Sequence, residues 1–383
     1  MGDKQLTPLS DTTKFIVDNR GKTVPTVENG IPLIATNCIK NNSLYPVYER
    51  IRYISQDTFD NWFRAHLEPN DIILTLKGSQ NGAVCLVPDT LGFAIAQDMV
   101  GLRINEKVIN PMYLFAVLRS KDIQTQIKNL DVSGVIPHLK KSDFNKLFIP
   151  RLEKEKENFI GKTYHDFCKK IDLLHCQNKT LEELAQTLFR KWFIKEAKDD
   201  WEAGTLGEVI SIFDSKRVPL SKMKRDKLKT GILYPYYGAA KIMDYINDYI
   251  FDGEYILMGE DGTVRTEDGY PILQYATGKF WVNNHTHVLQ AKEPYSNYFI
   301  WSYLLEKNID EIVTGAVQPK INQTNLKSLN FPKYPLNKVL QFNEQANTLL
   351  EKINQNKVQI KTLENMRDTL LPKFISGEVS VKL

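Results

Sequence analysis

Residues 179–182 read Lys-Thr-Leu-Glu, and residues 361–364 read Lys-Thr-Leu-Glu again, at an offset of 182 positions. The same offset aligns segment 137–192 with segment 319–374 without a gap. Self-similarity at one fixed offset indicates an internal duplication. The chain is therefore predicted to contain two copies of one structural plan.

The first part of each half is less alike than the second part. Ser133-Gly134 matches Thr314-Gly315 only with a shift of one residue, and segment 71–74 resembles segment 254–257. A diverged first part joined to a better-preserved second part suggests a variable reader on a common scaffold. A duplicated fold with another purpose would show part of this pattern as well.

The composition argues against several classes of protein. The chain has 383 residues, 42% hydrophobic and 25% charged, which is ordinary for two or three globular domains. No stretch approaches the roughly 20 apolar residues of a membrane helix. The polar segment 1–5 leads into no signal-peptide core, so we expect a cytoplasmic protein. The four cysteines form no Cys-x-x-Cys pair, which favours buried or idle thiols over a zinc or redox motif.

Segments 152–195 and 336–371 have helical periodicity. Apolar residues recur at alternating spacings of three and four, which predicts two coiled-coil seams, each roughly 50 Å long. The predicted seam positions are Ile160, Tyr164, Phe167, Ile171, Leu174, Asn178, Leu181, Ala185, Leu188 and Trp192 in the first helix, and Phe342, Ala346, Leu349, Ile353, Asn356, Ile360, Leu363, Arg367, Leu370 and Phe374 in the second. The alternative is that each helix packs only on its own domain.

The two seams are expected to bury each other as an antiparallel pair. If Asn178 faces Asn356, then Leu174 faces Ile360, and this register is consistent with the repeat. The same register also pairs Trp192 with Phe342, Ile171 with Leu363, and Ile160 with Phe374. A buried asparagine pair can fix register at a cost in stability. Alternatively, each asparagine occupies a separate hydrated position.

The remaining segments, 6–150 and 205–332, are predicted to be mixed α/β and mostly β. Strands are expected at 71–76, 83–87, 255–258 and 287–289, and short helices at 112–118 and 298–305. The predicted fold class is α+β, with two such domains related by a pseudo-two-fold axis and joined by two long antiparallel helices. The predicted boundaries are 1–150 for the first domain, 151–198 for the central helix, 199–333 for the second domain, 334–376 for the C-terminal helix and 377–383 for a tail.

No motif in the sequence supports catalysis. Asn110-Pro111-Met112-Tyr113 lacks the second proline of an adenine-methyltransferase loop and opens a predicted helix. Neither a glycine-rich cofactor loop nor a Walker phosphate loop is found. Glu196-Ala197-Lys198 is better explained as a solvated helix end than as a nuclease motif. His285-Thr286-His287 has no ligand partner at a convincing spacing, which favours a role without metal. We expect a non-catalytic chain with no cofactor.

A nucleic-acid site must come from local clustering, because the net charge is only +4. Segment 216–229 holds seven basic residues and one acidic residue, and tyrosines follow it. Segment 77–82 offers a cation and two amides, whereas its counterpart 259–263 is acidic and could accept from a cytosine amino group. A plain surface turn is the alternative for each segment. The candidate DNA-binding residues are Lys77, Ser79, Gln80, Asn81, Lys216, Arg217, Lys222, Lys224, Tyr236, Tyr237, Lys241, Gln318 and Lys320.

Two diverged globular halves, each followed by a related long helix, resemble the specificity subunits of Type I restriction–modification systems. Segments 147–150 and 329–332 look like the ends of such target-recognition domains, and segment 366–378 looks like the closing helix of the family. The resemblance covers nearly the whole chain. It is specific in the helices and loose in the readers.

The resemblance implies that each half reads one part of a bipartite double-stranded DNA site and that the helical pair sets the gap. It also implies two DNA-adenine methyltransferase subunits and a motor–nuclease subunit as partners. The methyl donor would then belong to the partners. Two alternatives remain: the specificity reader of a different modification or defence complex, and a coiled-coil adaptor whose globular halves bind protein.

Overall fold

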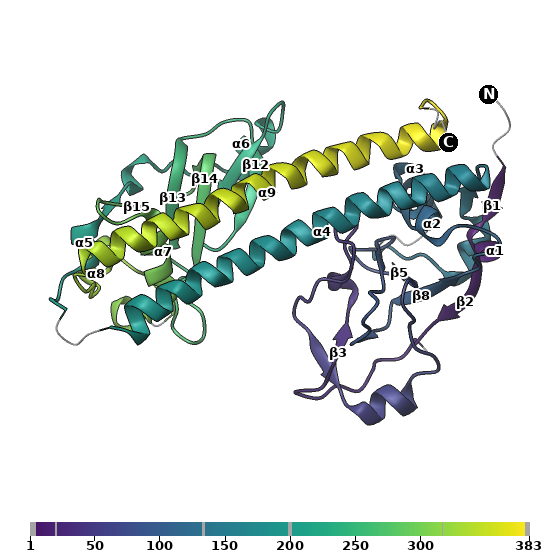
Figure 1. Ribbon diagram of the computed structural model, residues 1–383, viewed down its shortest axis with the longest axis horizontal. Coiled ribbons are helices and arrows are strands. Elements are labelled where there is room, and N and C mark those ends of the chain that lie inside the picture. The colour runs from purple at the N-terminus through teal and green to yellow at the C-terminus, as the bar shows by residue number, and fades with distance from the viewer. Residues whose placement is uncertain (1–4, 20, 132–134, 198–200, 316, 380–383) are drawn as a thin grey trace. The chain divides into compact units, whose positions relative to one another are not determined.

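The computed structural model describes residues 5–19, 21–131, 135–197, 201–315 and 317–379 (Figure 1). It divides into two compact units. Unit 1 comprises Met1–Gln177 and Gln355–Leu383, and unit 2 comprises Asn178–Asn354. Each unit therefore contains a globular part and a stretch of each long helix. Ser133, Gly134 and Lys198, which entered the sequence argument, lie outside the described residues.

The globular part of unit 1 is built on small sheets. A four-stranded antiparallel sheet has the order β2-β8-β5-β6, and a three-stranded sheet has the order β4-β3-β7 with β3 and β7 parallel. β1 pairs with β9. The strands are β1 (Leu6–Pro8), β2 (Thr13–Val17), β3 (Ile31–Ile34), β4 (Arg52–Ile54), β5 (Ile72–Thr75), β6 (Val84–Leu86), β7 (Ala94–Ile95), β8 (Met99–Ile104) and β9 (Phe148–Pro150).

Helix α2 (Pro111–Leu118) forms the centre of the unit 1 core, together with the four-stranded sheet and the first part of α4 (Lys154–Arg190). Asn110 caps α2 by accepting a hydrogen bond from the Tyr113 N–H at 3.0 Å, so this segment is a helix start, as predicted. A Cβ atom at Gly161 of α4 would lie 2.5 Å from Tyr113 N, which explains the glycine there. The short α1 (Leu9–Thr12) and the amphipathic α3 (Lys121–Leu130) were not predicted.

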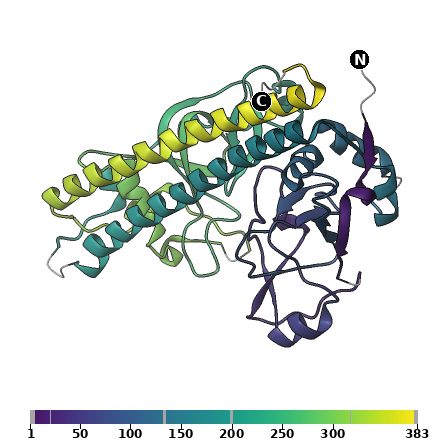
Figure 2. The same ribbon diagram turned by 45° about the vertical axis from the view of Figure 1, so that its right-hand side comes forward.

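Within unit 1, α4 packs antiparallel against the last part of α9 (Leu336–Ser376), as can be followed in both views (Figures 1 and 2). Ile171 and Leu174 form one apolar cluster with Ile360 and Leu363. Closer to the start of α4, the rings of Phe159 and Phe374 lie 6.0 Å apart, and Ile160 and Phe374 share the main core.

Asn356 donates a hydrogen bond to Gln177 Oε1 at 2.8 Å. Its proposed partner Asn178 falls in the other unit. The asparagine pairing therefore stays a prediction.

Unit 2 contains a six-stranded sheet with the order β10-β15-β13-β14-β11-β12, antiparallel except for the β11–β14 pair. Its strands are β10 (Ile210–Ile212), β11 (Tyr234–Tyr237), β12 (Ile242–Ile246), β13 (Phe251–Gly259), β14 (Leu273–Val282) and β15 (Thr286–Ala291). Its short helices are α5 (Leu206–Val209), α6 (Lys222–Lys227), α7 (Asn297–Leu305) and α8 (Gln323–Ser328).

The helices of unit 2 meet in a cluster of aromatic rings. Phe189 of α4 lies 5.2 Å from Phe299 of α7 and 5.6 Å from Phe342 of α9, and Phe193 also packs on both. Trp192 contacts Phe342 at 6.5 Å, the pair that the register predicted, but it is only partly buried. The end of α4 and the π-helical turn η4 (Lys191–Lys195) that follows it therefore bury positions 189 and 193 more fully than 188 and 192.

The two units follow the same plan. β2-β8-β5-β6 of unit 1 corresponds in order and direction to β10-β15-β13-β14 of unit 2. The single long strand β14 pairs first with β13 and then, in parallel, with β11. In unit 1 two short strands take the place of this one strand: β6 makes the antiparallel pair with β5, and β7 makes the parallel pair with β3. The predicted α+β class, with two similar domains and two long helices that pack antiparallel, is confirmed.

None of the helices in the described ranges is long and apolar enough to cross a membrane. Cys38, Cys85 and Cys168 are free thiols. Cys38, Cys85 and Cys168 are buried, whereas Cys176 is exposed on α4.

Candidate nucleic-acid interface

The basic segment 216–229 of unit 2 forms a surface helix followed by a turn. Ser221 caps α6 by accepting from the Lys224 N–H at 3.3 Å, which fixes a helix that buries none of its residues. Lys216, Lys222 and Lys224 are exposed. Lys216 also lies 5.1 Å from the ring centroid of Phe213. These side chains are available to neutralise phosphates.

Two other cations of this segment hold it to β12. Arg225 and Lys229 both pair with Asp244, at 3.1 and 3.0 Å. Burial alone would raise the pKa of Asp244, but the hydrogen bonds from Lys229 and Arg225 lower it below its usual value. Arg225 and Lys229 therefore anchor the segment. Of the basic residues described here, Lys216, Lys222 and Lys224 are the ones exposed to a ligand.

The tyrosines that follow the basic segment have different surroundings. Tyr236 is only 1% exposed, its hydroxyl accepts from the Leu220 N–H at 3.0 Å, and Arg225 lies over its ring. It supports the segment from below and presents no group to a ligand, which corrects its assignment as a DNA contact. Tyr237 packs on Phe280 and is partly buried, and this burial raises its pKa. Lys241 is exposed in the turn after β11.

A surface cluster that the sequence analysis missed lies on the neighbouring strands. Lys279 of β14 stands 4.4 Å from the ring centroid of Tyr249, which in turn contacts Tyr234 of β11 at 5.3 Å. These three residues are far apart in sequence. The pairing of β14 with β11 on one side and with β13 on the other brings them together.

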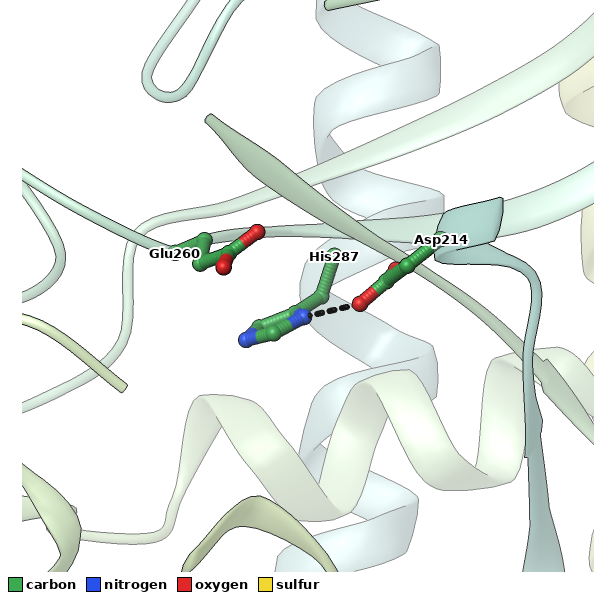
Figure 3. A group of neighbouring side chains, drawn as sticks. All are labelled: Asp214, Glu260 and His287. Carbon is green, nitrogen blue, oxygen red and sulfur yellow. Dashed lines mark hydrogen bonds and ion pairs between the residues drawn. The ribbon is translucent and has the colours of Figure 1, made fainter. Parts of the chain in front are cut away.

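Asp214, Glu260 and His287 form a polar cluster beneath the loops of unit 2 (Figure 3). His287 is fully buried, and its Nδ1 lies 2.6 Å from Asp214 Oδ2. Burial would raise the pKa of Asp214, but the contacts from His287, the Val288 N–H and Arg217 lower it. The histidine comes from β15, and Asp214 from the 3-10 turn that follows β10. Sequence spacing gave no sign of this partnership.

The contacts within this cluster fit an internal ion network rather than a metal centre. His287 Nε2 lies 2.8 Å from the Ile321 carbonyl oxygen and Nδ1 lies 2.6 Å from Asp214 Oδ2, so both ring nitrogens are already engaged by oxygen atoms of the protein. The guanidinium of Arg217 lies against Glu260 and donates to the Thr286 carbonyl at 2.8 Å. Arg217 therefore holds the place that a bound cation would need. Its candidate role as a DNA contact is corrected to an anchoring role, because its donors are used internally.

The candidate loops of the two units are held by the same backbone hydrogen bonds. In unit 1, the Gly78 N–H donates to the Pro137 carbonyl at 3.0 Å, and the Leu139 N–H to the Leu76 carbonyl at 2.8 Å. In unit 2, the Gly262 N–H donates to the Pro319 carbonyl at 3.0 Å, and the Ile321 N–H to the Glu260 carbonyl at 2.8 Å. Each loop after the central strand is thus joined to the segment around the repeated proline.

Both glycines have positive φ, 91° for Gly78 and 77° for Gly262, a conformation that favours glycine. The residues between each glycine and the preceding strand differ in charge, because Lys77 precedes Gly78 and Glu260 and Asp261 precede Gly262. In unit 1 the backbone of Lys77 forms an isolated antiparallel β-bridge with that of His138. In unit 2 the backbone of Asp261 forms one with that of Lys320.

The other candidates lie on or beside these loops. Ser79, Gln318 and Lys320 are exposed, and Gln80 is partly exposed. Asn81 Oδ1 is buried without a hydrogen-bond partner in the described part of the chain. Lys320 Nζ is 3.7 Å from Glu260, so it adjoins the Arg217 network.

The chain contains two α+β domains with the same strand order, and each has polar loops at the same place. Both domains pack on the long helices. These features define a protein with paired recognition domains. A family model described as Type I restriction modification DNA specificity domain matches residues 18–183 and 198–365. The chain belongs to this family and contains two copies of its domain.

Similar proteins agree with this assignment. A putative type I restriction enzyme specificity subunit of Haemophilus influenzae is 34% identical over 148 residues, which are 39% of this chain and 36% of that protein. The MjaIX specificity subunit of Methanocaldococcus jannaschii is 26% identical over 312 residues, 70% of this chain and 69% of that one. The crystal structure of the S subunit from M. genitalium matches with a TM-score of 0.54 at 17% identity, covering 98% of this chain and 97% of that chain. The likeness to that structure concerns the fold.

Proposed function

We propose that the chain is the DNA-reading subunit of a Type I restriction–modification complex and is not itself catalytic. Residues 1–150 and 199–333 each read one half of a bipartite target. The chain positions two DNA-adenine methyltransferase subunits, and a motor–nuclease subunit, on that target. Because its substrate is cellular and invading DNA, the complex acts in the cytoplasm.

The observation that carries this proposal is the repeated loop geometry. The Gly78–Pro137 and Gly262–Pro319 hydrogen bonds present two loops at equivalent places in two specificity domains. Their side chains differ, Lys77 and His138 against Asp261 and Lys320. Two loops with the same backbone hydrogen bonds but different polar side chains are suited to reading two different half-sites, because base edges are distinguished by their donors and acceptors.

The helices supply the second part of the proposal. α4 has 37 residues and α9 has 41, and each helix contributes packing residues to both units. A helix rises about 1.5 Å per residue, so a continuous pair of this length is suited to fix the gap between two half-sites. Phe159, Leu173, Val358 and Met366 are exposed apolar residues on these helices in unit 1 and suit the docking of a partner subunit.

The test is methylome sequencing of a host with and without this gene, with the neighbouring methyltransferase gene present in both. We expect one bipartite methylated motif to disappear when the gene is removed. Restoring the gene should restore the motif. An unchanged methylome, with the chain and the methyltransferase both expressed, would contradict the proposal and favour a protein-binding adaptor.

A further inference from the structure

An exposed valine occupies the same position in each specificity domain. Val135 is 92% exposed and Val317 is 100% exposed, and the repeat offset of 182 separates them. Each stands two residues before the proline whose carbonyl is held by a loop glycine. Single exposed apolar residues are common on protein surfaces. Their recurrence at one repeat position, in domains that have otherwise diverged, indicates a shared role.

The backbone beside each valine is fixed. In unit 1, Pro137 and Leu139 are both bonded to the loop after β5, and in unit 2 Pro319 and Ile321 are bonded in the same way to the loop after β13. Leu139 and Ile321 are fully buried. Each valine is therefore presented from an anchored segment, which lowers the entropy lost when its side chain makes a contact.

The surroundings of the valines favour DNA as the occupant. Val317 is followed by Gln318 and Lys320, both exposed, and Lys320 adjoins the network of Arg217, where the basic segment begins. Val135 shares its loop with His138, whose backbone forms an isolated β-bridge with that of Lys77. Lys140 comes two residues after His138. The core of a protein interface is depleted in charge. Polar and basic side chains beside exposed apolar groups, Val317 in unit 2 and Val135 with its neighbour Ile136 in unit 1, instead match a base edge flanked by phosphates.

We propose that Val135 and Val317 are specificity-determining residues that contact the 5-methyl group of a thymine, each in the half-site read by its own domain. This inference rests on the proposed function of the two domains. The thymine methyl is the apolar group that the major groove presents. Position 138 in one domain is a histidine and position 320 in the other is a lysine, and these different side chains flank the valines and set the remaining contacts.

The test uses the complete complex of this chain with its methyltransferase and a duplex carrying the bipartite motif. Each thymine of the two half-sites is replaced in turn by deoxyuridine, which removes only the 5-methyl group. With the wild-type complex, we expect one replacement in each half-site to weaken binding about fourfold, the effect of one buried methyl group. Val317→Ala should abolish this effect in one half-site and leave the other unchanged. Val135→Ala should do the reverse.

Val27→Ala, which truncates an exposed valine of unit 1 away from these loops, serves as the matched control and should leave both deoxyuridine effects intact. The inference is overturned if both loop variants retain both effects. It is also overturned if they lose the methyltransferase during purification without changing the response to deoxyuridine, because the valines then contact protein. Failure of the proposed function would look different, since the wild-type complex would then show no bipartite preference at all.

Discussion

The guanidinium of Arg367 lies over the ring of Tyr164, 6.0 Å from its centroid, inside the helical pair of unit 1. Arg367 is 6% exposed and makes two hydrogen bonds to Asp368, at 2.8 and 3.2 Å. Burial also raises the pKa of Tyr164 to about 12. The charge that interrupts the apolar seam is thus met by a neighbouring acid.

Shortening Arg367 should destabilise unit 1 because the long side chain fills space beside Tyr164. We expect Arg367→Ala to lower the free energy of unfolding by about 2 to 4 kcal/mol, whereas Arg367→Met should cost less than about 1 kcal/mol. Urea unfolding of the full chain measures both. Lys361→Ala, at an exposed position of the same helix, is the control. Equal effects of Arg367→Ala and Lys361→Ala would show that the arginine contributes no packing.

Asp214→Asn should destabilise unit 2 by about 3 kcal/mol at neutral pH, because it removes the charge that faces His287 and Arg217. The folded-state pKa of Asp214 is lowered, so its contribution is fully present above the unfolded pKa of about 3.9 and is lost as pH falls through the lower folded value.

Unfolding free energies of the wild type and of Asp214→Asn should therefore converge as the pH is lowered below about 4. Asp226→Asn, at an exposed acid of the same unit, controls for the loss of a surface carboxylate. A difference that stays constant down to pH 3 would contradict the assigned cause.

Reversing the free cations of the basic segment should weaken DNA binding without unfolding the domain. For Lys222→Glu combined with Lys224→Glu, we expect lower affinity for any duplex and a dependence on salt that is shallower by about 2 in log–log slope. Arg217 is left intact, because a carboxylate there would face Glu260 and Asp214. Lys327→Glu, on the exposed side of α8, is the control. If the double variant binds like the control across salt concentrations, the segment is only solvated surface.

Lengthening the helical pair should change the gap in the DNA target and neither half-site. Four residues inserted beside Glu183 of α4 add about one helical turn, and a matching insertion beside Glu351 of α9 keeps the predicted register. Methylome sequencing should then report the same two half-sites with a longer gap. A four-residue insertion in the turn at 266–269 should leave the gap unaltered. Persistent methylation with the original gap would refute the ruler role.

The architecture could be predicted from the sequence because its strongest signals are periodic. The seam spacing located both long helices, and the offset of 182 showed two related domains. The seam did not predict the burial of Phe189 and Phe193, because the chain there packs on α7 as well as on α9 and buries a wider face. Helix α3 was missed because its two buried residues, Ile123 and Ile127, form only a short pattern.

The candidate interface was harder to predict because its contacts join distant segments. Charge clustering identified segment 216–229, but charge alone could not tell Lys222, which is exposed, from Arg217, which faces Glu260. Asp214 and His287 are 73 residues apart, and the antiparallel pairing of β10 with β15 makes them neighbours. No local spacing reports such a contact.

Unit 1 is assembled from both ends of the chain, and this affects how the protein is made. A ribosome that has completed residues 1–354 has delivered all of unit 2 but not the helix segment that covers Tyr164, Cys168 and Ile171. The first domain to emerge is therefore the last to be finished. Until α9 is released, the nascent chain exposes the apolar face of α4 and needs protection from aggregation.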